Sequence, residues 1–300
     1  MVAASLRALL ERAIDYAGLF PPAELALEPA LRNYADYVRV GDAWMLGAFI
    51  LPVAQFAAAQ AVLPPFEADY PLRVSALGPK TNDSGSFLSA LESTRAAIDS
   101  FSDTLSIQQL EMFLPIQADG ELVKKIHSVL GAVKLKVFWE AGADAAEQTI
   151  RFLSEHNHAD LEMGFKLRTG GVTADAFPSP AQIAQALLAA AQHRVPIKFT
   201  AGLHHPLRQF HASVGTKMHG FLNVLGAGVL AAEHQWDERQ TVMMLEDEDA
   251  SSFTFDDSAF TWRDWSLATD RIPVHRKLVT SLGSCSFDEP REDLRALRFL

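Results

Sequence analysis

The sequence contains a single cysteine, Cys285, among its 300 residues. One cysteine cannot form a disulfide within the chain, and it cannot supply the several thiolates of a zinc cluster. Long apolar runs are also lacking, because none approaches the roughly 18 uninterrupted apolar residues that a membrane-spanning helix needs. We therefore expect a cytoplasmic protein that has no membrane partner.

Positive charge is scarce as well. The chain has 26 lysines and arginines against 37 aspartates and glutamates, which gives a net charge of −11. Such a charge argues against nucleic acid or an anionic membrane surface as the main partner, and an anionic substrate would need positive charge concentrated locally. The apolar first twenty residues contain Arg7, Glu11, Arg12 and Asp15 and show no cleavage pattern, so we expect no signal peptide.

A glycine-rich dinucleotide fingerprint is also missing, since no G-x-G-x-x-G follows the first predicted strand. What the sequence does have is a repeated alternation of short apolar runs with helical stretches. The predicted strands are 12–20, 44–51, 72–78, 106–114, 133–140, 161–168, 196–200 and 220–226. The predicted helices between them include 85–101, 119–130, 143–156 and 180–193.

Eight strand–helix units in about 226 residues favour a closed (β/α)8 TIM barrel, an α/β fold, over an open doubly wound sheet. The pattern breaks after residue 236, where an acidic run and several aromatic residues follow without a clear period. We therefore expect residues 1–236 to form the barrel and residues 237–300 to form a C-terminal extension packed on it.

Charged residues occur near the ends of several predicted strands, where barrel enzymes place their active sites. They are Asp15, Glu111, Lys136, Glu140, Lys166, Arg168 and Lys198. Lysine is costly in a buried strand, because its ammonium must be desolvated. Two lysines that face one bowl repel each other, so one pKa should fall and leave a neutral amine able to form a Schiff base with a carbonyl. Glu111 could then move the protons that this chemistry requires.

Other interpretations remain open. The lysines could be structural, paired with Glu111 and Glu140 in an ion-pair network. His204 and His205 follow strand seven directly, and with nearby carboxylates they could hold a divalent metal for a lyase or hydrolase. The barrel could also bind a small anionic metabolite without turnover. Cys285 lies in the expected extension with no obvious base, which argues against a nucleophilic thiol.

Several motifs resemble the deoxyribose-phosphate aldolase family, whose members are class I (Schiff-base) aldolases on an α/β barrel. Residues 135–142, LKVFWEAG, are similar to the strand-five motif of that family, and 166–170, KLRTG, to its strand six. Residues 198–204, KFTAGLH, are similar to its strand seven. The opening IDYAGLFP (14–21) and the segment LEMFLP (110–115) complete the resemblance, which covers about two-thirds of the chain.

This resemblance implies a lyase in which Lys166 is the Schiff-base lysine. It makes Lys198 the neighbour that depresses the pKa of Lys166, and Glu111 the acid/base, with Asp15 and Lys136 as supporting charges. We expect Lys136, Lys166 and Lys198 to point into the barrel mouth, with the amines of the last two about 3–6 Å apart.

The chain departs from the family at the substrate end. Arg168 stands where the family has a small residue, and the strand-eight phosphate loop of the family has no counterpart in 219–228. We expect a small carbonyl or anionic substrate, no metal and no other cofactor, with a homo-oligomer possible. The expected substrate contacts are Arg168, Thr169, Gly170, Gly202, His204, His205, Glu140 and Asn223.

Overall fold

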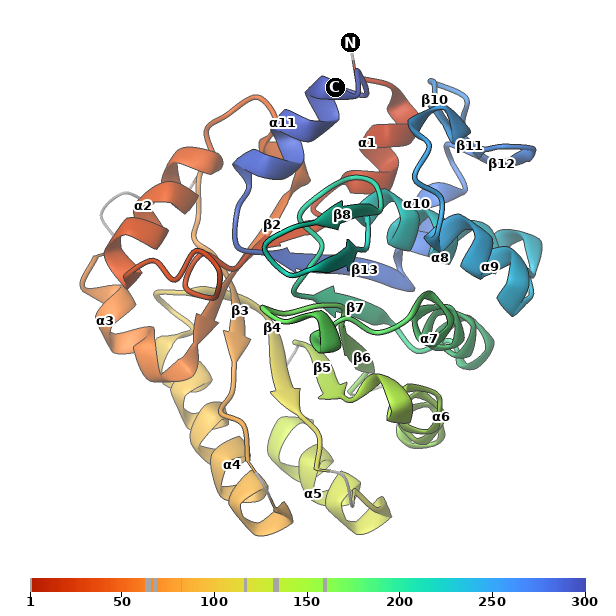
Figure 1. The fold of residues 1–300 in the computed structure, drawn as a ribbon. Helices are drawn as coiled ribbons and strands as arrows, with labels where there is room; N and C mark the ends of the chain where they lie inside the picture. The colour runs from red at the N-terminus through yellow and green to blue at the C-terminus, as the bar shows by residue number, and fades with distance from the viewer. Residues whose placement is uncertain are drawn as a thin grey trace.

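The computed structural model describes residues 2–62, 66, 69–81, 83–115, 118–131, 135–158 and 161–300. Eight parallel strands close into a barrel in the order β1-β13-β7-β6-β5-β4-β3-β2 (Figure 1). The predicted (β/α)8 barrel is therefore confirmed. The barrel strands are β1 Ile14–Tyr16, β2 Leu46–Pro52, β3 Arg73–Leu77, β4 Ser106–Phe113, β5 Lys136–Ala141, β6 Met163–Arg168, β7 Ile197–Thr200 and β13 Val279–Ser284. Residues 133 and 134 of the predicted fifth strand lie outside the described residues.

Helices surround the strands on the outside of the barrel (Figure 1). They are α1 Ala4–Leu10, α2 Leu27–Tyr37, α3 Phe56–Gln60, α4 Ser84–Phe101, α5 Gly120–Leu130, α6 Ala146–His156, α7 Pro180–His193, α8 Phe221–His234, α9 Glu238–Leu245, α10 Ile272–Arg276 and α11 Asp288–Ala296. Short 3-10 turns occur at Ala43–Met45, Val53–Gln55, Ala143–Ala145, Ala174–Ala176 and Ala250–Ser252. No helix within the described ranges has both the length and the apolar character to cross a membrane.

Two helices begin where the sequence places a start signal. Asp119 accepts a hydrogen bond from the backbone N–H of Leu122 at 2.8 Å and so caps α5. Ser179 and Gln182 form a reciprocal capping box at the start of α7, with Pro180 in its first turn. These caps satisfy backbone donors that the helix itself leaves unpaired.

The prediction for the eighth strand was wrong. Residues 220–226 belong to the start of helix α8, and the eighth strand is β13. Every residue from Phe221 to Ala231 is buried, so this helix is apolar on all sides. Such a run does not show the helical period that would separate it from a buried strand. The true strand, VTSLGS, is short and half polar, which concealed it.

The domain boundary at residue 236 is wrong for the same reason. Residues 237–300 include β13, which pairs with both β1 and β7 and completes the barrel wall. The segment between α8 and β13 is an insertion that contains α9, α10 and a three-stranded antiparallel sheet of β10 Phe253–Phe255, β11 Ala259–Trp262 and β12 Trp265–Ala268. A two-stranded hairpin, β8 Gln209–His211 and β9 Thr216–Met218, precedes α8.

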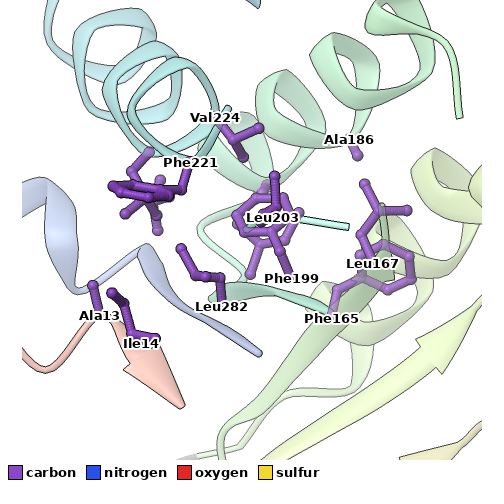
Figure 2. Close-up of a cluster of buried hydrophobic side chains, with 14 of the residues drawn as sticks. Ala13, Ile14, Phe165, Leu167, Ala186, Phe199, Leu203, Phe221, Val224 and Leu282 are labelled. Atoms are coloured by element: carbon purple, nitrogen blue, oxygen red, sulfur yellow. The ribbon is translucent and has the colours of Figure 1, made fainter. Parts of the chain in front are cut away.

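Strand alternation explains why two lysines face the inside of the barrel. In β6, Phe165 and Leu167 point outward toward the helices, and in β7 Phe199 does the same (Figure 2). Side chains of a strand alternate between its two faces, so Lys166 and Lys198 point inward. The two lysines are direct partners in the β6–β7 register. The outward residues pack against Ala186 of α7 and Phe221 and Val224 of α8, which fixes both strands (Figure 2).

Candidate active site

A cavity of about 310 Å³ opens at the carboxyl ends of the barrel strands. The strand ends and the loops that follow them supply its walls. Phe20, Ile50, Leu77 and Phe113 give it an apolar part. The chemically active side chains that line it are Glu140, Lys166, Arg168, Thr200, His204 and Cys285.

The two inward lysines and three carboxylates form one continuous network below this cavity. The Nζ atom of Lys166 lies 2.8 Å from Oε2 of Glu111 and 2.8 Å from Oε2 of Glu140. The Nζ atom of Lys198 lies 2.5 Å from Oε1 of Glu111 and 2.7 Å from Oδ2 of Asp15. Glu111 therefore separates the two ammonium groups, with one lysine on each of its oxygens.

The two lysines differ in access to the cavity. Lys166 is 5% exposed and lines the cavity, whereas Lys198 is fully buried and does not. Each lysine contacts two carboxylates: Lys166 contacts Glu111 and Glu140, and Lys198 contacts Glu111 and Asp15. Lys166 is thus the amine that a molecule in the cavity can reach.

The electrostatics of Lys166 differ from the sequence-based prediction. Burial lowers its pKa, but the charges of Glu111 and Glu140 outweigh burial, and the pKa is raised above the ordinary 10.5. Burial also acts against the charge of Glu111, yet Lys166 and Lys198 hold its pKa below the ordinary 4.5. The predicted depression of the Lys166 pKa by Lys198 is therefore wrong, because the carboxylate of Glu111 lies between the two amines.

Asp15 occupies the far end of the network and is held by four donors. Its Oδ1 accepts the backbone N–H of Ala48 at 2.7 Å. Its Oδ2 accepts from Gln109 at 3.1 Å, Ser281 at 2.9 Å and Lys198 at 2.7 Å. Ser75 donates in the same way to Glu111. These bonds satisfy the lone pairs of buried carboxylates that would otherwise be costly to desolvate.

His204 and Cys285 meet at the rim of the cavity. Nδ1 of His204 lies 3.8 Å from the Cys285 sulfur and 3.3 Å from Oε2 of Glu289 in α11. Burial lowers the pKa of His204, but these two contacts outweigh it and raise the pKa to about 9. Cys285 was not predicted to line the site, because residues 237–300 were expected to form an extension. Its position directly after the polar strand VTSLGS was the available signal.

Arg168 ends β6, has an exposed side chain and lines the same cavity. Among the described residues, its guanidinium has no carboxylate partner within ion-pair distance. An unpaired guanidinium beside a cavity can bind a carboxylate or phosphate through two parallel hydrogen bonds. Gly202 also lines the cavity, with φ of +77° and its backbone close to Gly170, a conformation and approach that suit glycine.

Two predicted site residues lie away from this cavity. Lys136 is the first residue of β5 and is exposed at the amino end of the barrel, so the prediction that it points into the same mouth was wrong. Asn223 lies inside α8, where its amide donates to the carbonyls of Met244 and Asp247 and accepts from the N–H of Arg208. Asn223 was predicted as a substrate contact because residues 220–226 were expected to form the eighth strand, but this segment belongs to α8.

Three further residues play structural parts near the rim. Thr169 is fully buried, and its hydroxyl donates to the carbonyls of Thr200 and Ala201. Gly170 lets this turn approach the loop after β7. His205 forms a 2.6 Å contact with Asp293 and stacks on His211, so it does not share the position of His204. Within the described ranges, no group of three or more His, Cys, Asp or Glu side chains is arranged to hold a metal ion.

Comparison with known proteins yields no family. No family model matches the chain, and no curated protein matches it. The chain is similar to the solved structure of QR15, an aldolase, with 12% identity and a TM-score of 0.43 over 64% of this chain and 80% of that one. It is also similar to a monomeric dihydrodipicolinate synthase variant, with 13% identity and a TM-score of 0.38 over 65% of this chain and 64% of that one.

A third similar structure is a mutant tryptophan synthase α-subunit from the hyperthermophile Pyrococcus furiosus. Its identity is 10% and its TM-score 0.38, over 69% of this chain and 82% of that one. Likenesses this distant assign neither a reaction nor a substrate.

Proposed function

We propose that the carboxyl-end cavity is the active site of a class I aldolase-type lyase, in which Lys166 forms an imine with a small carbonyl compound. The observation that carries this proposal is the placement of the Lys166 amine. It borders a cavity of substrate size, and two carboxylates lie 2.8 Å away. Lys198 is buried and does not line the cavity, so its role is to balance the negative charge of Glu111 and Asp15.

The first requirement is a neutral amine. Because Glu111 and Glu140 raise the pKa of Lys166, the side chain is an ammonium near pH 7. The proton must pass to a carboxylate, and Glu140 both contacts the amine and borders the cavity. The free amine then attacks the carbonyl carbon, and the carbonyl oxygen takes a proton from Glu140. Glu140 then carries the second amine proton to the new hydroxyl, which leaves as water, and a protonated imine remains.

The carboxylates around Lys166 can stabilise the protonated imine. A protonated imine carries the same single positive charge as the ammonium that it replaces, so Glu111 and Glu140 stabilise both. The carboxylates that make deprotonation rare therefore also keep the imine protonated. A protonated imine withdraws electrons from the adjacent carbon–carbon bond, and Glu140, as a carboxylate, can remove the hydroxyl proton when that bond breaks.

Arg168 favours a substrate that bears an anionic group. It lines the cavity and has no carboxylate partner among the described residues, whereas the imidazolium of His204 already pairs with Glu289. The cavity volume of about 310 Å³ lies at the lower end of ligand sites, which fits a small molecule. We therefore favour small oxo acids and hydroxy-oxo acids as substrates.

Borohydride trapping tests the proposal. Borohydride added with a panel of aldehydes, ketones and 2-oxo acids should fix one adduct, which mass spectrometry should locate on the peptide that contains Lys166. Lys166→Ala should abolish the adduct. Lys198→Met should reduce it, because Glu111 would then act on Lys166 alone and hold its proton more strongly.

Lys217→Ala is the matched control, because Lys217 is an exposed lysine that pairs with Glu248 and does not line the cavity. It should leave trapping unchanged. Adducts spread over exposed lysines, or none with any carbonyl compound, would remove the basis for an imine mechanism. Activity lost to a chelator and restored by zinc or manganese would favour a metal enzyme instead.

A further inference from the structure

A second cavity, of about 320 Å³, lies at the opposite end of the barrel. The starts of the strands line it: Arg73 is the first residue of β3, Lys136 is the first of β5, and Arg12 precedes β1. Because the barrel strands are all parallel, these starts share the amino rim. We call this the amino-end cavity.

The amino-end cavity is lined mainly by positively charged side chains, although the protein as a whole is negatively charged. Five basic side chains line it: Arg12, Arg73, Lys136, Arg276 and Lys277. They are about a fifth of the 26 lysines and arginines of a chain whose net charge is −11. The lining carboxylates are Glu11 and Asp15, and Asp15 already accepts a hydrogen bond from Lys198. Positive charge is therefore in clear excess.

These basic groups lack protein partners of opposite charge. Among the described residues, none of the five has a carboxylate within ion-pair distance. Arg276 donates only to backbone carbonyls, those of Val279 and Glu11 at 3.3 Å and of Thr280 at 2.5 Å. Its Nε–H is buried and has no acceptor within the described residues. A buried donor without an acceptor is costly, so the backbone contacts of Arg276 leave this one donor unexplained.

We propose that the amino-end cavity is a binding site for a small phosphate-bearing molecule, separate from the carbonyl site. The guanidinium groups of Arg12 and Arg73 offer the planar fork that matches phosphate oxygens, Arg276 adds the Nε–H that lacks an acceptor, and two lysines add charge. A phosphate group with two negative charges is attracted more strongly by these basic side chains than a carboxylate with one. The ring of Phe138 and the side chains of Ala8 and Pro273 supply an apolar wall for the organic part of the ligand.

Titration calorimetry on the full-length chain tests the site with inorganic phosphate and glycerol 3-phosphate. Each lysine within about 6 Å of a dianion should change the affinity about five- to tenfold at low salt. The double variant Lys136→Gln/Lys277→Gln removes two exposed charges and should weaken binding by at least that factor. The matched control is Lys124→Gln/Lys217→Gln, which removes two exposed lysines elsewhere and should bind as the parent does.

The variant Arg168→Gln separates the two cavities, because Arg168 lines only the carboxyl-end one. It should leave phosphate affinity at the amino end unchanged. Loss of binding in Arg168→Gln, with normal binding in the Lys136/Lys277 variant, would overturn the proposal. Absence of binding at millimolar concentrations and low salt would overturn it as well. Neither result bears on imine formation at Lys166, so the two proposals fail independently.

Discussion

The substitution Glu111→Gln removes one charge from the centre of the buried network and keeps the shape of the side chain. Glu111 is fully buried and contacts both ammonium groups. In the variant, Lys166 retains Glu140 and Lys198 retains Asp15, but no carboxylate separates the amines. Removing one partner of a buried ion pair typically lowers the free energy of unfolding by about 3–5 kcal/mol. We expect that range, which corresponds to a fall in Tm of about 6–10 °C for a chain of this size.

The loss should also depend on pH. The folded pKa of Glu111 lies below its ordinary 4.5, so its contribution is present above pH 4.5 and is lost as pH falls through the folded pKa. The folded pKa of Lys166 lies above 10.5, so its contribution is complete below pH 10.5 and is lost as pH rises further. The difference between parent and variant should therefore be widest between about pH 5 and 10.

Urea unfolding followed by tryptophan fluorescence at several pH values measures this difference. Glu121→Gln, which removes an exposed glutamate paired with Lys124 on α5, is the control and should change nothing measurable. An unfolding midpoint in Glu111→Gln equal to that of the parent across this pH range would refute the reasoning. It would mean that the two amines do not depend on the carboxylate between them.

Four further predictions concern single residues. The rate of imine trapping at Lys166 should be nearly flat between pH 7 and 9, because the ammonium proton passes to Glu140 within the site, and a tenfold rise per pH unit would contradict this transfer. His204→Gln should cost stability fully below pH 6.5, and this cost should vanish as pH rises through about 9, as urea titrations would show. Asn223→Ala should lower the free energy of unfolding by about 1–3 kcal/mol, through unpaired backbone groups, and leave trapping intact. An adduct fixed on Lys166 should slow alkylation of Cys285 by iodoacetamide, because both residues line one cavity.

The sequence was sufficient to predict the barrel and the inward lysines, for a local reason. In β6 and β7 the lysines stand between apolar residues, so a strand and its two faces follow from consecutive residues. Lys166 and Lys198 could therefore be assigned to one interior from their neighbours in the chain. Glu140 and Glu111 were recognised as near, but the position of Glu111 between the amines depends on the stagger of the strands, which no local pattern encodes.

The errors have a different origin. Helix α8 is buried on every side, so its apolar residues carry no period, whereas β13 has serines and a glycine where a strand usually has branched apolar residues. Because the last strand was predicted at 220–226, Asn223 was wrongly included among the site residues and Cys285 was left out. Lys136 was assigned to the wrong end of the barrel. It is the first residue of β5, whereas Lys166 lies near the end of β6. The alternation of side chains shows which face a residue takes, but not how far along the barrel axis it lies.

The pairing of β1 with β13 has a consequence for how the protein is made. Ile14 emerges from the ribosome long before Leu282, its partner across the barrel seam. Until then, β1 and β7 are the open edges of a seven-stranded sheet, and each presents unpaired backbone groups. Open edges recruit strands from other chains, so nascent or truncated copies that lack residues 279–284 should aggregate or exchange strands. During synthesis these two edges therefore stay unpaired until residues 279–284 have been made.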